Sequence, residues 1–320
     1  MPSLSVVVVS YNNIEDIRTC VESALAATTA PIELIVVDNA SRDASADVVA
    51  AIADARVRLV RLRHNIGFGR ACNLAVSRAV NDIVVLLNPD TVVQPGALDA
   101  LAAHVVAHPR DVPLGGRTLS PDGTLDPQSC WGAPTLWSTF CTATGLTSAF
   151  RGSRLFDPEA LGGWRRDDIR PVGVVTGCLL AMPRTTWQEI GGFDPRYFVY
   201  GEDADLSVRA RRLGYRPTIT PAATIVHKVG ASSETRADKY VLLFAGKLTF
   251  VDVNWTGAKR AAARVLIRGG VALRALAAVL TSDRVCREWR RTWLRRAQWQ
   301  HGFPEIPDPS TADLAEIDAG

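Results

Sequence analysis

Four short, nearly continuous apolar runs in the N-terminal third constrain the fold of this chain more than any other feature. The runs are rich in β-branched residues and lie at 4–9, 33–37, 57–60 and 83–87. Strands of this kind are buried on both faces, as in a parallel sheet, and amphipathic stretches between them are typical of helices. The pattern predicts an α/β fold with a βα-wound sheet and right-handed crossovers.

Local signals predict where three of the intervening helices begin. Asn12 or Asn13 is a suitable N-cap for the helix after the first strand, and Ser41 for the next helix. Pro95 suits the first turn of a fourth helix because its missing N–H would have no partner there.

Beyond residue 115 the periodicity changes. Residues 115–170 are rich in Gly, Pro, Ser, Thr and Trp, which is typical of a functional loop or short edge structure. A strand-like run at 171–182, a helix at 203–213 and a helical pattern from 240 to about 300 follow. These signals indicate that the α/β body covers residues 1–256.

Positive charge is concentrated in one C-terminal segment. Residues 257–301 hold 11 Lys and Arg against 2 Asp and Glu, although the whole chain carries only +3. Trp289 and Trp293 share one face of this basic helical extension, which favours an amphipathic helix on an anionic membrane surface. A solvated helix or a contact between subunits of a homo-oligomer is the alternative, and no nucleic-acid-binding module accompanies the charge. The acidic, proline-containing tail, 302–320, is expected to be disordered.

The sequence also indicates a location for the protein. The most apolar long stretch, 261–281, contains Arg264, Arg268 and Arg274, which argues against a membrane-spanning helix. The cysteines form no C-x-x-C pair, and no signal-peptide pattern precedes the first strand. We therefore expect a reduced, cytoplasmic protein that is peripheral on the inner face of the cell membrane.

Polar residues follow each of the four predicted strands, at the edge where parallel sheets bind ligands. They lie at 10–13, 38–41, 65–73 and 88–91. Asp90, directly after a buried strand, is suited to hold Mg²⁺ or Mn²⁺ against a diphosphate. Each cluster also has a structural interpretation, with Asp38 as a turn or cap residue and 88–90 as a turn. The dinucleotide fingerprint is missing after the first strand, which disfavours a nicotinamide or flavin enzyme.

A second group of acids enters the helix predicted at 203–213. Glu202, Asp203 and Asp205 could be favourable charges at a helix N-terminus, and Asp205 is spaced to pair with Arg209. Asp203 is the candidate general base, because it can meet an acceptor hydroxyl at the start of the helix. His227 ends a strand-like run, where a lone histidine is usually structural and metal ligation is the alternative.

Jointly, these motifs resemble the family 2 glycosyltransferases of the GT-A fold, and most closely a rhamnosyltransferase branch of bacterial cell-wall and polysaccharide assembly. The resemblance covers roughly residues 3–230. The motifs that carry it are Ser10-Tyr11-Asn12, Val36-Val37-Asp38-Asn39, Asn65-x-Gly67-Phe68-Gly69, Asn88-Pro89-Asp90 in place of Asp-x-Asp, Thr176-Gly177 and Glu202-Asp203.

The resemblance implies a mixed-sheet GT-A domain with a nucleotide-sugar half, 1–115, and an acceptor half, 116–256. It implies inverting, metal-dependent transfer of a sugar, with L-rhamnose from dTDP-rhamnose preferred over a UDP-sugar. The acceptor would be a polyprenyl-diphosphate-linked or other glycan.

The resemblance also implies a role for each matching residue. Asp203 would be the catalytic base, and Asp90 and His227 would bind Mn²⁺ or Mg²⁺. The donor nucleotide would contact Ser10, Tyr11, Asp38, Asn39, Gly67, Arg70 and Asn73. The acceptor side would include Asn88, Thr176, Gly177 and Glu202. Asn88 replaces the first acid of Asp-x-Asp, and its neutral amide is expected to shape the loop.

Two other functions fit parts of the pattern. A nucleotidyltransferase that makes sugar nucleotides also uses a βα-wound sheet and a metal, but it normally has a Gly-rich, basic loop after the first strand. A catalytically silent, membrane-associated scaffold of the same fold is supported only by Asn88.

Overall fold

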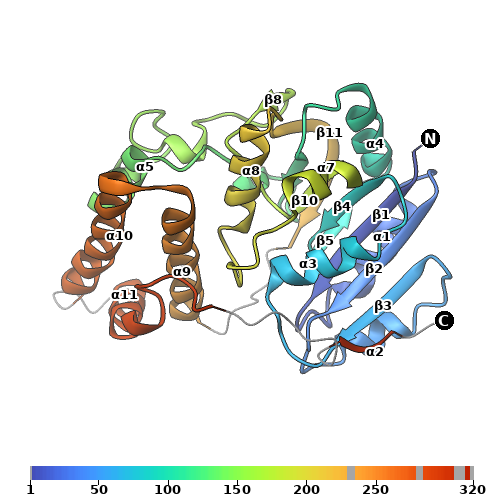
Figure 1. Ribbon diagram of the computed structural model, residues 1–320, viewed down its shortest axis with the longest axis horizontal. Helices are drawn as coiled ribbons and strands as arrows, with labels where there is room; N and C mark the ends of the chain where they lie inside the picture. Colours follow the sequence, from blue (N-terminus) through green and yellow to red (C-terminus); the bar gives the residue numbers. More distant parts are fainter. Residues whose placement is uncertain (1, 229–234, 279–283, 306–313, 318–320) are drawn as a thin grey trace.

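The computed structural model describes residues 2–228, 235–278, 284–305 and 314–317. Within these residues a ten-stranded mixed sheet has the order β12-β3-β2-β1-β4-β10-β6-β11-β5, with β8 beside β11 (Figure 1). Its strands are β1 (Leu4–Ser10), β2 (Ile32–Asp38), β3 (Val57–Leu62), β4 (Ile83–Leu87), β5 (Thr91–Val93), β6 (Leu114–Leu119), β8 (Arg170–Pro171), β10 (Leu179–Pro183), β11 (Thr218–His227) and β12 (Leu314–Ile317). A separate ribbon pairs β7 (Cys130–Trp131) with β9 (Val174–Val175).

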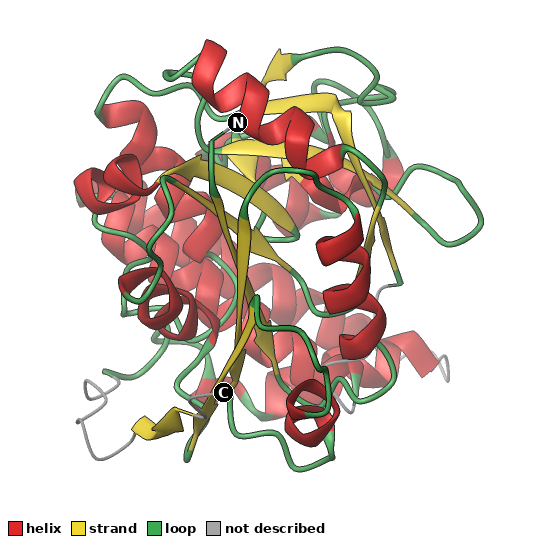
Figure 2. Cartoon of the chain, turned by 90° about the vertical axis from the view of Figure 1, so that its right-hand side faces the viewer, coloured by secondary structure: helices red, strands yellow, loops and turns green. Residues whose placement is uncertain are grey.

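The four predicted strands are confirmed as the parallel core of the sheet, in the order β3-β2-β1-β4. Every residue of β1 and β4 is buried, as their continuous apolar sequences require. Seen from the side, the strands run between helices that cover both faces of the sheet (Figure 2). The helices of this half are α1 (Ile17–Ala26), α2 (Ser45–Ala50), α3 (Phe68–Ser77) and α4 (Ala97–Ala107).

The predicted helix starts are wrong by a few residues. Helix α1 begins at Ile17 and α2 at Ser45, and Pro95 lies two residues before α4. The side chains expected to cap helices connect two loops instead. The N–H of Asn12 donates to Ser41 Oγ at 3.0 Å, and the Oδ1 of Asn12 accepts from the N–H of Arg42 at 2.8 Å. These bonds fix the loops after β1 and β2 to each other.

The acceptor half differs more from the expectation. The run at 171–182 is divided among β8, β9 and β10, because the chain changes partner from β11 to β7 and then to β4. The region read as irregular contains β6, α5 (Leu136–Thr144) and α6 (Leu146–Ala149). Strand β6 was not predicted because Gly115 and Gly116 are untypical of strands. Glycine is needed at 116, where a Cβ would lie 2.4 Å from the carbonyl oxygen of Ala223. Helices α7 (Arg184–Ile190) and α8 (Glu202–Arg212) complete this half.

The C-terminal helices form a second hydrophobic core beside the sheet domain. They are α9 (Arg236–Asn254), α10 (Gly257–Ala277) and α11 (Arg284–Leu294). Figure 1 shows them grouped on the side of the molecule away from β3. Their core includes Phe244 and Leu248 of α9 and the fully buried Trp299. The helical unit therefore starts with α9, before the boundary expected at 256.

The tryptophans of α11 face the protein, contrary to the predicted lipid contact. Trp289 stacks on Tyr240 of α9 with 4.5 Å between ring centroids, and Trp293 lies 6.4 Å from Trp299. The apolar side of α11 is therefore covered by α9 and by the chain that follows α11. Arg287 and Arg290, in contrast, are exposed.

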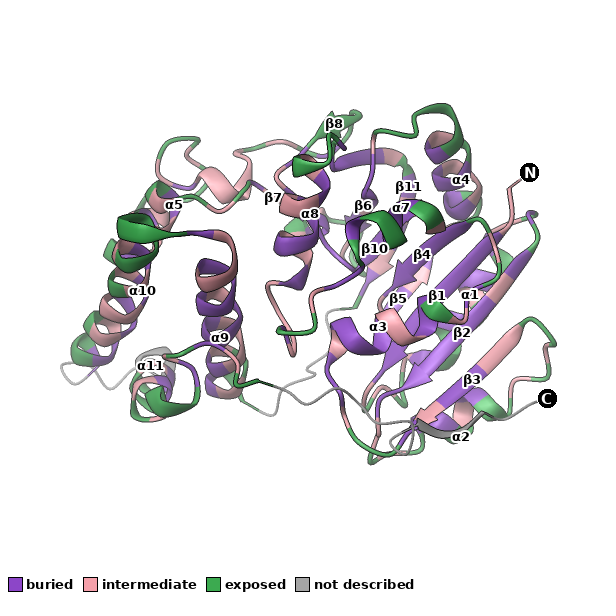
Figure 3. Ribbon diagram, in the orientation of Figure 1, coloured by how far each residue is buried: buried purple, intermediate pink, exposed green. Residues whose placement is uncertain are grey.

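Three arginines of α10 also point inward. Arg264 forms an ion pair with a carboxylate of α9, Arg268 donates to a carbonyl after α11, and Arg274 donates to carbonyls at the end of α5. The outer face carries large apolar side chains that are more than 60% exposed, namely Val265, Leu273 and Leu276. Figure 3 shows this contrast between buried strands and exposed outer helical faces. Among the residues that the structure describes, no helix is long and apolar enough to cross a bilayer.

The tail differs from the expected disorder in two places. Residues 302–305 continue directly from the second core, and Leu314–Ile317 form β12, antiparallel to β3. Residues 306–313 and 318–320 lie outside the described part of the chain.

The packing of β6 leads to a stability prediction. We expect Gly116→Ala to lower the free energy of unfolding by about 1–3 kcal/mol, because its Cβ would collide with the backbone of β11. The control is Gly269→Ala in α10, where a Cβ would meet nothing within 4 Å. That change is expected to stabilise by about 0.5–1 kcal/mol through helix propensity. Urea denaturation measures both, and equal effects would contradict the packing at β6.

Candidate active site

A cavity of about 460 Å³ opens where the carboxyl ends of β1, β2 and β4 meet loops of the acceptor half. It brings together most of the predicted site residues, from segments far apart in sequence. Those that line it are Tyr11, Asn39, Gly67, Asn88, Asp90, Thr176, Gly177, Glu202, Asp203 and His227.

Strand pairing places Asp90 beside His227. Asp90 directly precedes β5, which runs antiparallel to β11 with Thr91 opposite His227. The N–H of Lys228 donates to the carbonyl of Asp90 at 2.9 Å and closes this ladder. As a result, Asp90 Oδ1 lies 3.3 Å from His227 Nε2 at the cavity wall.

Asp126, which sequence reasoning missed, fixes the other side of the imidazole. Its Oδ2 lies 3.0 Å from His227 Nδ1, and its Oδ1 accepts from the N–H of Gln128 at 3.0 Å. Burial opposes protonation of His227, but hydrogen bonds with Asp126 and Asp90 outweigh burial and raise its pKa to about 9. No local pattern marks Asp126, because it meets His227 only once β6 pairs with β11.

Asp90 and His227 form a donor pair suited to a divalent cation. A proton held by Asp126 on Nδ1 leaves the Nε2 lone pair directed toward Asp90, the arrangement common for histidine ligands. No group of three or more His, Cys, Asp or Glu residues suited to a metal occurs among the described residues. Two protein ligands completed by phosphate oxygens are characteristic of Mg²⁺ sites on nucleotides.

Glu202 and Asp203 lie opposite this pair, in the first turn of α8. The preceding loop turns sharply, with φ of 65° at Tyr200 and 104° at Gly201. It approaches α9 so closely that a Cβ on Gly246 would lie 1.9 Å from the carbonyl oxygen of Tyr200. This close packing directs both carboxylates into the cavity.

Both carboxyl groups have a pKa above its ordinary value. Burial raises the pKa of Asp203, and a hydrogen bond from the backbone of Gly177 only partly opposes this. Burial, and then the charge of Asp203, raises the pKa of Glu202. Glu202 Oε2 and Asp203 Oδ1 are buried without a hydrogen-bond partner among the described residues. Paired acids with raised pKa values in a cavity are typical of acid–base catalysis.

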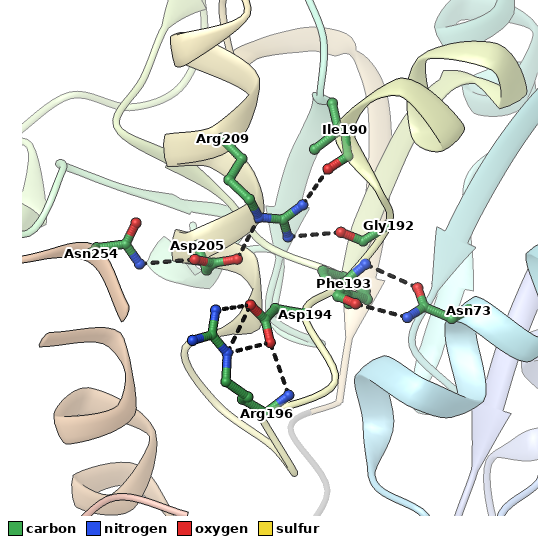
Figure 4. Close-up of polar contacts among 9 residues, drawn as sticks. All are labelled: Asn73, Ile190, Gly192, Phe193, Asp194, Arg196, Asp205, Arg209 and Asn254. Atoms are coloured by element: carbon green, nitrogen blue, oxygen red, sulfur yellow. Dashed lines mark hydrogen bonds and ion pairs between the residues drawn. The ribbon is translucent and has the colours of Figure 1, made fainter. Parts of the chain in front are cut away.

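A buried ion pair anchors α8 below these acids (Figure 4). Arg209 Nε donates to Asp205 at 2.6 Å, and its guanidinium also donates to the carbonyls of Ile190 and Gly192. Asn254 of α9 donates to the second oxygen of Asp205 at 2.8 Å. The structural interpretation of Asp205 and Arg209 is thereby confirmed.

Ser10 and Asp38, predicted to contact the donor, do not themselves line the cavity, although their neighbours Tyr11 and Asn39 do. Ser10 and Asp38 are in register, and both are buried. Asp38 Oδ2 accepts from the N–H of Ser41, whereas Asp38 Oδ1 and Ser10 Oγ lack a partner among the described residues. Asn39 accepts from the N–H of Ile66 and so orders the loop at 65–67.

Arg70 and Asn73 do not line the cavity, contrary to their predicted contact with the donor. Asn73 exchanges two hydrogen bonds with the backbone of Phe193, at 2.8 and 2.9 Å (Figure 4). Arg70 Nε donates to the carbonyl of Pro195 at 3.0 Å. Both side chains attach α3 to the segment that leads into α8.

The other residues predicted for the acceptor side, Asn88, Thr176 and Gly177, also line the cavity. Asn88 Nδ2 donates to Cys178 Sγ at 3.7 Å, which agrees with its expected role in shaping the loop. Thr176 donates to the carbonyl of Gln128 at 2.7 Å. Several lining residues had no signal in the sequence, because apolar and single polar residues are common everywhere. They are Gln128, Trp131, Phe198, Lys239, Leu242 and Leu243.

Comparison with known proteins decides the family. Residues 5–165 match the profile of glycosyl transferase family 2. The chain belongs to this family. As a family 2 glycosyltransferase it is a hexosyltransferase, and its residues 171–230 match a second profile, the N-terminal domain of galactosyltransferase.

Relatives and solved structures agree with this assignment. The glycosyltransferase is 29% identical to N-acetylglucosaminyl-diphospho-decaprenol L-rhamnosyltransferase of Mycobacterium tuberculosis, over 93% of this chain and 99% of the relative. It is 38% identical to succinoglycan biosynthesis protein ExoO of Rhizobium meliloti, over 37% of this chain and 36% of that protein.

Among solved structures, the mannosyltransferase PcManGT from Pyrobaculum calidifontis has a TM-score of 0.52 at 17% identity, over 93% of this chain and 85% of that chain. GalNAc-T7 has a TM-score of 0.53 at 16% identity, over 78% of this chain and 50% of that chain. These similarities show the GT-A fold.

The contact between Asp126 and His227 leads to a metal-binding prediction. We expect Asp126→Asn to weaken Mn²⁺ binding about 10–100-fold, because the histidine loses the carboxylate that orients it. Calorimetric titration of Mn²⁺ in the presence of dTDP measures this. Asp122→Asn, an exposed change on the same connection, is the control and should have wild-type affinity. Equal affinities for all three proteins would reject the metal assignment.

Proposed function

We propose that this enzyme is an inverting, divalent-metal-dependent transferase that moves a sugar from a nucleoside-diphosphate donor to a hydroxyl of a lipid-linked glycan. The observation that carries the proposal is that Asp90, His227 and Asp203 line one cavity. A bound Mn²⁺ or Mg²⁺ would neutralise the charge that develops on the leaving diphosphate. Two similar structures, of GalNAc-T7 and PcManGT, contain Mn²⁺ together with UDP and GDP-mannose respectively, which supports this choice of metal.

Asp203 is the proposed base. The acceptor oxygen bonds to the anomeric carbon on the face opposite the diphosphate, and the bond from that carbon to the diphosphate oxygen breaks. Asp203 takes the hydroxyl proton on Oδ1, which has no other partner among the described residues. Its raised pKa makes it a stronger base than an exposed aspartate. Displacement from the opposite face inverts the configuration of the sugar.

The nucleoside is proposed to bind near Ser10 and Asp38, with Tyr11, Asn39 and Gly67 closer to the sugar. A carboxylate oxygen without a partner suits the N3–H of thymine or uracil, which is a hydrogen-bond donor. The 29% identity with a mycobacterial L-rhamnosyltransferase over nearly its full length favours dTDP-L-rhamnose over a UDP-sugar. The same relative's acceptor is N-acetylglucosaminyl-diphospho-decaprenol, which favours a polyprenyl-diphosphate-linked acceptor here.

Such an acceptor requires contact with a membrane, and we propose the inner face of the cell membrane. Exposed bases on α10, on α11 and directly after α11 support attraction to anionic lipid. They are Lys259, Arg260, Arg287, Arg290, Arg291 and Arg296. The exposed apolar side chains of α10 would add to this contact in place of the inward-facing tryptophans.

Removal of the base is the direct test of mechanism. We expect Asp203→Asn to reduce transfer about 10²–10⁴-fold while Mn²⁺-dependent binding of dTDP is retained. Glu202→Gln changes the neighbouring acid of the same cavity and is expected to remain active. In the wild type at saturating Mn²⁺, kcat/KM should fall as pH drops through the raised pKa of Asp203, well above the ordinary aspartate value of about 4. Wild-type turnover by Asp203→Asn would rule out this base.

A donor panel tests the sugar. The enzyme is incubated with Mn²⁺, N-acetylglucosaminyl-diphospho-decaprenol and either dTDP-L-rhamnose, UDP-N-acetylglucosamine, UDP-galactose or GDP-mannose, and products are read by mass spectrometry. We expect consumption of dTDP-L-rhamnose with release of dTDP. Use of a UDP-sugar instead would contradict the proposed donor. Release of pyrophosphate would indicate a nucleotidyltransferase. Absence of metal-dependent nucleotide binding would indicate a silent scaffold.

A further inference from the structure

A second cavity, of about 420 Å³, adjoins the catalytic cavity on the side of the C-terminal helices. Phe198 and Leu242 line both cavities, so the two share a wall. Most of the remaining wall is apolar and consists of Val241, Ala245, Phe303 and Pro304. We call this second cavity the α9 groove, because α9 supplies one side of it.

The opposite side of the α9 groove is firmly held. Arg268 of α10 donates to the carbonyl of Gln300 at 3.1 Å, and the N–H of Phe303 donates to Thr249 of α9 at 2.9 Å. Trp299, directly before the first of these anchors, is fully buried. The residues that close the groove are therefore part of the second core and are not a loose tail.

Phe198 separates the groove from the donor side. Its carbonyl accepts from the N–H of Phe68 at 2.8 Å, and a Cβ on Gly67 would lie 2.5 Å from that carbonyl oxygen. On its other side, the Phe198 ring lies 6.3 Å from the Phe303 ring. The groove therefore meets the catalytic cavity, which Glu202 and Asp203 also line, at Phe198 and Leu242.

Two cations lie where the cavities meet. Lys239, an exposed residue in the second turn of α9, lines the catalytic cavity and has no ion-pair partner within the described residues. Arg295 lines the groove and forms an ion pair with Asp238. The catalytic cavity, with Lys239 and Asp203 among its lining residues, thus adjoins a mostly apolar groove.

We propose that the α9 groove holds the first isoprenoid units of a polyprenyl-diphosphate-linked acceptor, with Lys239 binding the diphosphate and the sugar hydroxyl reaching Asp203. This assignment rests on the proposed transfer to a lipid-linked glycan. An apolar chain, a diphosphate and a sugar follow one another in such a molecule, and the two adjoining cavities offer an apolar wall, a lysine and a carboxylate to receive them. A free oligosaccharide would leave the apolar wall in contact with water, which costs free energy in proportion to its area.

Two acceptors distinguish the contribution of the isoprenoid chain from that of the diphosphate. One is N-acetylglucosaminyl-diphospho-farnesol, and the other has the same headgroup with a methyl group in place of the farnesyl chain. We expect the wild type to prefer the farnesyl acceptor in kcat/KM by about tenfold or more, through burial of the chain. Gln298→Trp, which fills the groove from its exposed rim, should remove this preference. Ala297→Trp, the adjacent exposed position outside the groove, should keep it.

Lys239 is tested with the same pair of acceptors. Lys239→Ala should lower kcat/KM about tenfold for both, because both carry the diphosphate, and Lys247→Ala on the same helix should change neither. A Gln298→Trp enzyme that retains the farnesyl preference would overturn the groove assignment, as would a Lys239→Ala enzyme with unchanged kinetics.

A binding measurement separates failure of the groove from failure of the proposed function. Farnesyl diphosphate with a terminal benzophenone is photolysed with the full-length protein, and adducts are mapped by mass spectrometry. Adducts are expected within 241–245 or 298–304, and adducts only on the outer face of α10, or none, would reject the groove. Labelling of the groove without transfer to either acceptor would instead reject the acceptor class and leave the groove as an isoprenoid site.

Discussion

The antiparallel pairing of β11 with β5 is the contact on which the site depends. It places His227 between Asp90 and Asp126, and each of these three residues is less than a tenth exposed. Two carboxylates buried around one imidazole are costly unless a positive charge lies among them. The raised pKa of His227 is one answer to that requirement, since a proton supplies the charge. A divalent cation would supply more positive charge than a proton does, which would favour its binding at Asp90 and His227.

The position of Asp203, the proposed base, depends on the C-terminal helices. The loop that turns Asp203 into the cavity passes against α9 at Gly246, where a side chain would not fit. Farther along α9, Asn254 donates to the buried Asp205 and so holds α8 in place. The helical extension thus helps to position the proposed base, and the same helix lines the α9 groove. The proposed base and the proposed acceptor site therefore depend on one rigid element, which favours a fixed geometry between them.

The sequence predicts those features that are encoded locally. Strands β1 to β4 follow from their own apolar runs, and Asp90 and Asp203 follow from their places at a strand end and a helix start. Asp126 could not be found in this way, because its partner His227 lies 101 positions away. Asn73 shows the converse limit. The family resemblance implied donor binding for Asn73, but its amide forms hydrogen bonds with the backbone of Phe193. Only the folded chain reveals which polar group takes up each hydrogen bond.

The sequence alone also left the roles of the charged and apolar residues of α10 and α11 ambiguous. Arg264, Arg268 and Arg274 form bonds within the protein and do not present their charge to the surroundings. The tryptophans of α11 pack against the second core. The exposed face of α10 is consequently apolar, with bases at its start and on α11. Such a face suits the boundary between headgroups and acyl chains better than a purely electrostatic contact does. If an isoprenoid acceptor enters beside α9, this arrangement lets the enzyme take the acceptor from the bilayer while its diphosphate stays near water.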